Sequence, residues 1–386
     1  MDDADAADAA DAPPVSRNVY LMLVLCVIWG FADSVWSGTV LAAWVFLLSD
    51  ESNSDVGYVE AAQGLASLIT ALPVGYVADK MGRQGVIRVG GLSFLAAAAA
   101  TAWSVVNPHG DDDKQALLML TGALCLWGLG GGIFSGPAQA LFADSIPRGE
   151  RSKWYMYLMI CYLLPGICGP LASIAMFHYY GNDWSLEELK PVFLFGIACE
   201  VPAAGLAFLF KDSLALPEGE EEDGDEEGSG GAELGEAGAP KPEHLKEWRR
   251  GSNGGCVTVK MVPYVMFFSQ LCIAIGSGMT IKFFPLFFKQ QIDLSPIAVQ
   301  SIFVVSPIVM AALSGAFQQL SKSVGRIQVM ILTKVVGVSL ICVMALLIHL
   351  EIHTWHYMIP IYILRTGFMN ATCALLNKDP CCRFLK

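Results

Sequence analysis

The chain has 386 residues, of which 54% are apolar and only 16% are charged, and its mean hydropathy is +0.51. A water-soluble domain cannot place so much apolar surface in water, so the composition excludes a soluble enzyme and indicates a membrane protein. The formal net charge is −12, but 15 of the 36 acidic residues lie in two segments, 2–11 and 218–236, which leaves 21 acids against 24 Lys and Arg elsewhere. We expect both segments to be disordered and solvated, with a binding or regulatory role as the alternative.

Ten apolar runs along the chain are long enough to cross a bilayer core of about 30 Å. Their limits are 19–48, 56–79, 86–106, 115–143, 154–179, 190–210, 261–288, 295–320, 327–349 and 355–376. The sequence therefore predicts an all-α polytopic membrane protein. We expect a disordered tail (1–17), a six-helix bundle (18–211), an acidic Gly-rich loop (212–258) and a partial, four-helix bundle (259–386).

Lys and Arg concentrate in the loops after the second, fourth, sixth and eighth runs, and the alternate loops are poor in them. Because basic loops stay on the cytoplasmic side, we expect the N-terminus and the 212–258 loop to be cytoplasmic. The N-terminus lacks the basic start of a secretory signal. We expect a multi-pass protein of the plasma membrane or an endomembrane.

The link between the second and third runs reads GYVADKMGRQG. It has the spacing G-x-x-x-D-[RK]-x-G-R at Gly75, Asp79, Lys80, Gly82 and Arg83. Glycines let two helices approach closely, and charges at helix ends form ion pairs that can break when the helices move. This pattern resembles the signature loop of the major facilitator superfamily, which implies a gating role.

Two further links resemble the same family. The link after the fourth run contains a pattern similar to A-D-x-x-P-x-x-x-R at Ala143, Asp144, Pro147 and Arg151. Asp144 and Arg151 are the candidate gating partners of the first motif. The link after the eighth run repeats the end of that motif at Gly325 and Arg326.

The resemblance covers residues 18–376 and implies two bundles related by pseudo-symmetry around a site near the middle of the membrane. The family has twelve helices, whereas this sequence has ten runs. We therefore expect helices 11 and 12 to be missing, as in a truncated or misassembled gene product.

Ionisable side chains inside predicted helices are the main candidates for a site, since a charge at the bilayer centre costs about 2.5 to 3.5 kcal/mol. Asp33 and Arg365 lie in the first and tenth runs, which the resemblance places at the central cavity. We expect Asp33 to carry a coupling proton and Arg365 to be its switchable counter-charge, with a purely structural ion pair as the alternative. Glu200 is a further candidate, although it could instead accept backbone donors freed by Pro202.

Other polar residues in the runs carry weaker signals. Gln270 and Asn370 are candidate hydrogen-bonding contacts for a substrate. We expect Glu60 to reach headgroup water and Lys282 to extend its ammonium toward the interface. The fourth run has three glycines at four-residue steps, which we expect to pack against another helix backbone: Gly128, Gly132 and Gly136.

The sequence predicts a secondary active transporter that moves a small solute by alternating access, with a proton as the coupling ion. Secondary transport is favoured because no G-x-x-x-x-G-K-[ST] nucleotide-binding loop occurs. A non-transporting receptor or scaffold of the same fold remains the alternative. We expect no enzyme activity, cofactor, metal or nucleic acid, and the expected partners are a solute, the lipid bilayer and a proton.

Overall fold

The computed structural model describes residues 15–107, 113–147, 150–216, 262–352 and 354–371. These residues form helices and no strand. The helices, in chain order, are α2 (Arg17–Trp36), α3 (Thr39–Leu48), α4 (Asn53–Met81), α5 (Arg83–Val106), α6 (Asp113–Asp144), α7 (Arg151–Leu163), α8 (Pro165–Tyr180), α9 (Leu186–Leu206), the short η1 (Ala207–Leu209) and η2 (Asp212–Leu214), α11 (Val262–Ile281), α12 (Phe284–Ile292), α13 (Pro296–Val324), α14 (Arg326–His349) and α15 (Trp355–Asn370). The predicted all-α class is confirmed.

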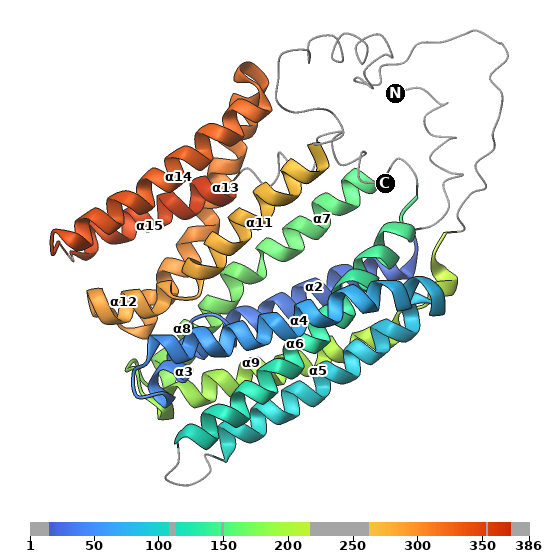
Figure 1. The fold of residues 1–386 in the computed structure, drawn as a ribbon, viewed down its shortest axis with the longest axis horizontal. Coiled ribbons are helices and arrows are strands. Elements are labelled where there is room, and N and C mark those ends of the chain that lie inside the picture. The colour runs from blue at the N-terminus through green and yellow to red at the C-terminus, as the bar shows by residue number, and fades with distance from the viewer. Residues whose placement is uncertain (1–14, 108–112, 148–149, 217–261, 353, 372–386) are drawn as a thin grey trace. The chain divides into compact units, whose positions relative to one another are not determined.

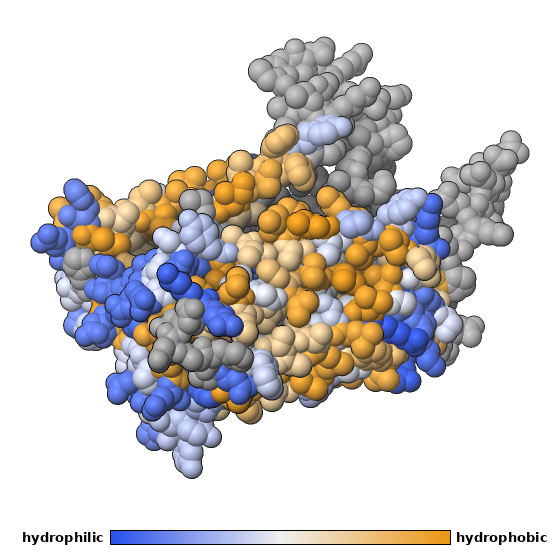
Figure 2. Space-filling view, turned by 60° about the horizontal axis from the view of Figure 1, so that its bottom comes forward, coloured by the Kyte–Doolittle hydropathy of each residue, from blue (hydrophilic) through white to orange (hydrophobic). Residues whose placement is uncertain are grey.

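Each predicted run coincides with helix in the described residues, and eight helical stretches there are long and apolar enough to cross a membrane. On the face drawn in Figure 2, apolar side chains form a broad band and hydrophilic side chains gather at its two ends. The last part of the tenth run, 372–376, lies outside the described residues. Length, composition and surface therefore agree with a polytopic membrane protein.

Three of the predicted runs are broken rather than continuous. The first divides at Ser37 and Gly38, where Gly38 has φ −85° and ψ −99°, outside the helical region. The fifth divides at Pro165, because proline lacks the N–H that would continue the helical ladder. The seventh divides between α11 and α12. At the first break the backbone of Gly38 is non-helical, which a membrane protein tolerates only where protein or a cavity surrounds it.

Serine side chains start four of the spanning helices. The hydroxyls of these residues accept a hydrogen bond from a backbone N–H in the first turn, at 3.3 to 3.4 Å: Ser16 of α2, Ser52 of α4, Ser185 of α9 and Ser295 of α13. Such caps satisfy donors that the helix itself leaves free.

The described chain falls into two compact units. The first contains the helices up to α9 and those from α12 onward, and α11 belongs to the second. Within the first unit α6 packs against α4 and α5, and α2 packs against α8 and α9 (Figure 1). Contacts of α13 with α8, and of α12 with α3, join the two halves of the sequence.

Glycines permit the closest of these approaches. A Cβ added at Gly128 or Gly132 of α6 would collide with the backbone of α4 at Gln63 and Ser67. The predicted packing face is therefore confirmed at these two positions, whereas Gly136 faces open space.

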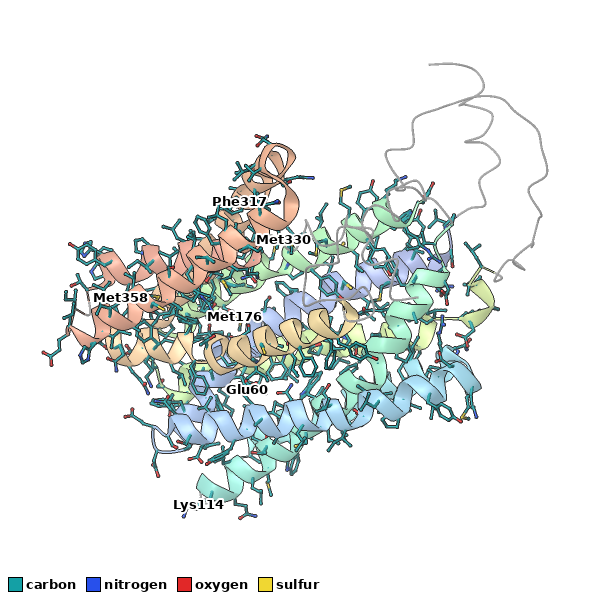
Figure 3. All side chains as sticks on the ribbon, turned by 45° about the horizontal axis from the view of Figure 1, so that its top comes forward. Glu60, Lys114, Met176, Phe317, Met330 and Met358 are labelled. Carbon is teal, nitrogen blue, oxygen red and sulfur yellow. The ribbon has the colours of Figure 1, made fainter. Side chains whose placement is uncertain are left out.

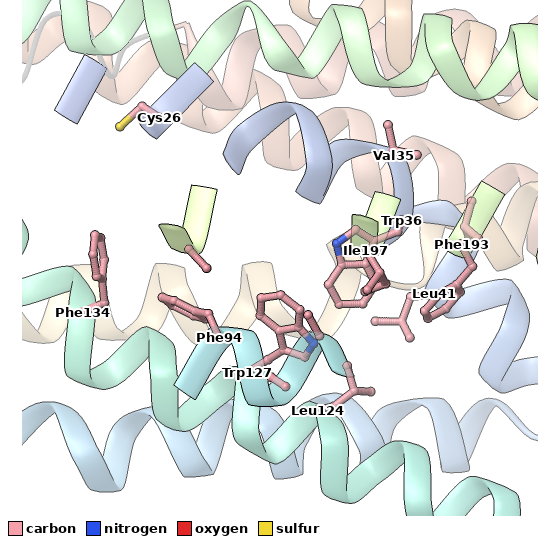
Figure 4. Close-up of a cluster of buried hydrophobic side chains, with 14 of the residues drawn as sticks. Cys26, Val35, Trp36, Leu41, Phe94, Leu124, Trp127, Phe134, Phe193 and Ile197 are labelled. Carbon is pink, nitrogen blue, oxygen red and sulfur yellow. The ribbon is translucent and has the colours of Figure 1, made fainter. Parts of the chain in front are cut away.

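An aromatic core lies between α2, α5, α6 and α9 (Figure 4). The ring centroid of Trp36 lies 5.4 Å from those of Trp127 and Phe193, and Phe94 lies 5.6 Å from Trp127. Such edge and tilted contacts add to the stabilisation from burial. A smaller cluster joins α12, α13 and α15, where the rings of Phe284 and Tyr362 are 4.6 Å apart.

Candidate functional site

Two adjoining cavities follow helix α2 through the first unit, and they share Trp29 and Asp33. The first has a volume of about 450 Å³ and is lined by Met22, Leu25, Cys26, Trp29, Gly30, Asp33, Ser34, Phe134, Ser135, Gln139, Tyr162 and Gly166. The second has a volume of about 340 Å³ and is lined by Trp29, Asp33, Trp36, Glu60, Gln63, Gly64, Ser67, Phe94, Trp127, Gly128, Gly131, Glu200 and Lys282. Both volumes are in the range of small-molecule sites.

Asp33 occupies the point where the two cavities meet. Its side chain is exposed on α2, four residues before the break at Ser37, whereas the next residue, Ser34, packs against α8. The Ser34 hydroxyl donates to the carbonyls of Phe31 and Pro165, both at 2.9 Å. A Cβ at Gly169 would collide with Ser34, so the small residues of α8 fix this part of α2 in place. The exposed side chain of Asp33 is thereby placed on the wall of both cavities.

Glu200 is the most deeply buried acid of the second cavity, at 3% exposure. The indole Nε1 of Trp36, which is also buried, donates to its Oε1 at 3.1 Å. Glu200 precedes Pro202 by two positions, but it accepts from a side chain of α2 rather than from backbone donors freed by that proline.

Glu60 and Lys282 form an ion pair on the wall of the same cavity. The Lys282 Nζ lies 3.2 Å from Glu60 Oε1 and donates to the carbonyl of Ser37 at 3.3 Å. Glu60 is on α4 (labelled in Figure 3), and Lys282 lies in the two-residue turn between α11 and α12. The two residues are 222 positions apart in sequence, and the ion pair is a contact that the expectation of solvated or interfacial side chains did not include.

Arg365 lies away from both cavities. It is buried on α15 at 7% exposure, its guanidinium is 5.2 Å from the ring centroid of Phe284, and its Nε has no hydrogen-bond partner in the described structure. The described residues show no ion pair between Arg365 and Asp33. The predicted pair thus stays a prediction.

The other two predicted contacts are placed as follows. Asn370 is exposed at the end of α15, and its amide donates to the carbonyl of Thr366 at 3.0 Å. Gln270 belongs to α11, and its side chain falls outside the described part of the chain. Asn370 is not among the residues that line the two described cavities.

The signature motif lies at one end of the first unit, which we term the basic end (residues 79–88, 144–153 and 211–216). Here Arg83, at the start of α5, forms an ion pair with Asp144, at the end of α6. Asp79 is exposed and Lys80 lies 4.4 Å above the ring of Tyr76. One predicted partner of the motif, Asp144, is therefore in contact with it.

The remaining motif positions have no ion pair in the described structure. Arg151, at the start of α7, has a buried Nε without a hydrogen-bond partner. Gly75 faces open space on α4. Gly325 has φ +107°, which lets the chain turn sharply from α13 into α14. Arg326 begins α14, and its side chain lies outside the description.

Asp212 is a functional candidate that the sequence did not reveal. Its carboxylate accepts from the backbone N–H of Gln84 at 2.8 and 3.1 Å, and the Gln84 side chain accepts in return from the N–H of Asp212 at 3.2 Å. Gly82 allows this because its φ is +89° and a Cβ there would lie 2.8 Å from the Asp212 carboxylate. The segment that leaves α9 thus caps the helix that begins within the signature motif.

Further bonds fasten this segment, residues 211–216, to the basic end. Asn18 donates to the carbonyl of Lys211 at 2.8 Å and to the hydroxyl of Ser145 at 3.2 Å. The hydroxyl of Ser16 donates to Leu214 at 2.7 Å, and the N–H of Leu216 donates to the carbonyl of Asp144 at 2.9 Å. The start of α2, the Arg83–Asp144 ion pair and the exit of α9 therefore form one network.

The two halves of the sequence are hydrogen-bonded to each other at the opposite end, which we term the outer end (residues 49–55, 180–186 and 289–297). There Trp184 Nε1 donates to the carbonyl of Leu294 at 2.7 Å, and Asn182 accepts from the N–H of Ile297 at 3.0 Å. Asn53 and Gln290 exchange amide hydrogen bonds. Among the described residues, every hydrogen bond between the halves lies at this end or at Lys282.

Comparison with known proteins agrees with this helical membrane architecture. The family model described as Major Facilitator Superfamily matches residues 24–377. The chain belongs to the Major Facilitator Superfamily. Within this superfamily it is a multi-pass integral membrane protein, and the signature motif and Asp33 lie inside the matched region.

One relative and several solved structures are similar to the chain. The protein named MFS efflux pump atnC of Emericella nidulans is 30% identical over 168 residues, which is 42% of this chain and 30% of that protein, so the chain spans under a third of this relative. The xylose transporter XylE from E. coli, in a partially occluded inward-open conformation, has a TM-score of 0.62 at 12% identity, over 95% of this chain and 83% of that one.

A bacterial homologue of the iron transporter ferroportin, in an outward-facing state, has a TM-score of 0.55 at 14% identity, over 94% of this chain and 84% of that one. At these identities the solved structures support the fold alone. Both solved structures therefore agree with the fold that the family model assigns.

Proposed function

We propose that this superfamily member is a secondary active transporter that moves a small solute by alternating access and couples the movement to a proton. The observation that carries the proposal is the position of Asp33. A single carboxylate at the junction of two cavities contacts both, so its protonation can depend on what either cavity contains. Intramembrane carboxylates of this kind are typical of proton relays in transporters.

The arrangement of contacts between the halves supports alternating access. The halves are joined at the outer end, and the described residues of the basic end contribute no hydrogen bond or ion pair between them. Such an asymmetry fits a state in which the solute enters from the basic end. For the opposite state, the outer-end bonds must break and the basic ends of the two halves must meet.

We further propose that the basic end, the N-terminus and the 212–258 loop face the cytoplasm of a plasma membrane or endomembrane, since Lys and Arg concentrate at that end. The gating role of Asp79, Arg83 and Asp144 belongs to the same proposal. Their positions at helix ends allow ion pairs that exist in one state only. In another state Arg365 becomes the counter-charge of Asp33.

Flux through purified protein tests the function. Proteoliposomes that contain the full chain and an internal pH indicator are offered a pool of small solutes, with and without a proton gradient, and accumulated solutes are identified by mass spectrometry. We expect gradient-driven accumulation of at least one solute, with an accompanying pH change inside. Asp33→Asn should abolish uphill accumulation and retain some downhill exchange, and Glu51→Gln, an exposed acid outside the cavities, should behave as wild type.

Two results would contradict the proposal. Uphill accumulation by Asp33→Asn at the wild-type rate would exclude the coupling role of this residue. A wild-type protein that is folded and correctly inserted but moves no member of the pool would favour the alternative, a receptor or scaffold of the same fold.

A further inference from the structure

The second cavity is rich in hydrogen-bond acceptors that lack donors. The Oε1 of Glu60 is buried and accepts no hydrogen bond, although the Lys282 ammonium lies 3.2 Å away. The Oε1 of Gln63, on the same wall, is buried and has no hydrogen-bond partner. Because an unsatisfied buried acceptor is costly, a cavity with these groups favours a ligand that brings donors or positive charge.

The chain already places one cation in this cavity. The Lys282 ammonium sits between the Glu60 carboxylate and the carbonyl of Ser37, which lies in the break between α2 and α3. Asp33, Glu60 and Glu200 together bring three carboxyl groups to the cavity against this single ammonium. The site is therefore able to hold an ammonium group, and one lysine does not neutralise it.

Aromatic rings form much of the remaining wall. Trp29, Trp36, Phe94 and Trp127 all line the second cavity. The faces of such rings attract cations, most strongly where water is excluded, and they also bury the apolar body of a ligand. A volume of about 340 Å³ accommodates a small organic molecule but not a peptide.

We propose that the second cavity binds an organic cation, an amine or aromatic ammonium compound, which takes the place of the Lys282 ammonium on Glu60. Glu60 belongs to α4 in the first half of the sequence, and Lys282 lies in the turn before α12 in the second half. Displacement therefore removes an ion pair between the halves. As a statement about substrate class this rests on the proposed transport function, but binding itself is measurable without flux.

The test is equilibrium binding to the full chain in lipid nanodiscs at about pH 8, where carboxyl groups are ordinarily ionised. Three probes of similar size and shape are compared: radiolabelled 1-methyl-4-phenylpyridinium as the cation, 4-phenylpyridine as the neutral compound and biphenyl-4-carboxylate as the anion. We expect saturable binding of the cation only. This comparison uses wild-type protein, so it stands even if a variant fails to fold.

Substitutions then assign the binding to this cavity. Lys282→Gln removes the internal competitor and should tighten cation binding about tenfold or more, whereas Glu60→Gln should weaken it by a similar factor. In the double variant the gain from Lys282→Gln should disappear, because the freed carboxylate is absent. Lys289→Gln and Glu51→Gln are the matched controls, since these residues lie nearby and outside the cavity.

Saturable binding of the anion or the neutral compound instead of the cation would overturn the inference. An unchanged cation affinity in both Lys282→Gln and Glu60→Gln would also overturn it, because binding would then occur elsewhere. Failure of the proposed function looks different: cation binding with the expected variant pattern but no flux refutes transport and leaves the binding site standing. Flux of other solutes without cation binding refutes the site and leaves transport standing.

Discussion

Replacement of Asp212 by alanine should loosen the start of α5. The Asp212 carboxylate accepts from the Gln84 N–H at 2.8 and 3.1 Å and adds a negative charge near the N-terminus of the helix. Loss of a cap costs about 0.5 to 2 kcal/mol, and loss of a favourable charge at a helix N-terminus costs about 0.3 to 1 kcal/mol. Together these give about 1 to 3 kcal/mol for local opening, which corresponds to about a 5- to 150-fold larger open population.

Hydrogen exchange measured by mass spectrometry reports this opening directly. Peptides that cover the first turn of α5, including Gln84, should exchange faster by that factor in Asp212→Ala, while peptides from the middle of α6 should not change. Asp212→Asn keeps an acceptor and loses the charge, so it should accelerate exchange only about two- to fivefold. Ser52→Ala removes the cap of α4 and serves as the control, because it should affect α4 alone.

Exchange in the first turn of α5 that is the same in wild type and Asp212→Ala would refute the capping role. Equal acceleration by Asp212→Ala and Ser52→Ala would refute its specificity. Confirmation would show that the exit of α9, and with it the start of the 212–258 loop, holds the helix that begins within the signature motif.

Three further changes have defined outcomes. Gly132→Val places a side chain against the α4 backbone and should lower the thermal unfolding midpoint in detergent, through an overpacking cost of about 1 to 3 kcal/mol. Gly136 faces open space, so Gly136→Val should leave the midpoint unchanged. Equal midpoints for the two variants would count against close packing at Gly132. Asp79→Asn should insert normally but slow solute counterflow at equal expression, and a wild-type rate would exclude gating. Trp36→Phe removes the hydrogen-bond donor to buried Glu200 and should destabilise the protein by about 1 to 3 kcal/mol. Glu200→Gln keeps an acceptor for Trp36 and should destabilise the protein less. A larger loss of stability in Glu200→Gln than in Trp36→Phe would contradict the role of this hydrogen bond.

The helices and their order could be predicted from sequence because they depend on local patterns. Apolar runs of about 20 residues fix the spans, and the spacing of the signature motif points to a gate. One long-range contact was also predictable. The resemblance made Asp144 a candidate partner of the motif that contains Arg83, and these two side chains form an ion pair in the structure. The four-residue steps of Gly128 and Gly132 correctly indicated a close helix contact.

The cavity chemistry was less accessible to sequence. Glu60 and Lys282 are far apart in the chain, and only the break of α2 at Ser37 and the packing of α12 bring them together. Asp212 follows α9 in a polar segment that resembles many others, and its role depends on the backbone of Gly82. Such contacts follow from tertiary packing, for which local periodicity carries no signal.

The proposed pairing of Asp33 with Arg365 is a contact of a second conformational state. The resemblance assigns the helices of Asp33 and Arg365 to the cavity, and Asp33 lines both described cavities. In the described state Arg365 instead packs against Phe284. A sequence specifies all states at once and does not distinguish their contacts.

Distances between spin labels at the two ends of the first unit test the central claim, alternating access, most directly. Genetically encoded nitroxide labels avoid the 11 cysteines of the chain. One pair replaces exposed Met156 and Leu320 toward the basic end, and the other replaces exposed Tyr180 and Leu350 toward the outer end. Double electron–electron resonance spectroscopy of the labelled protein in nanodiscs measures both distances at about pH 5 and about pH 8, a range that includes the upper part of the ordinary titration of carboxyl groups.

Alternating access predicts reciprocal change: under conditions where the basic-end distance shortens, the outer-end distance lengthens. Asp33→Asn should remove the response of both distances to pH. Distances at both ends that stay fixed under every pH and solute condition, or that change in the same direction, would contradict alternating access.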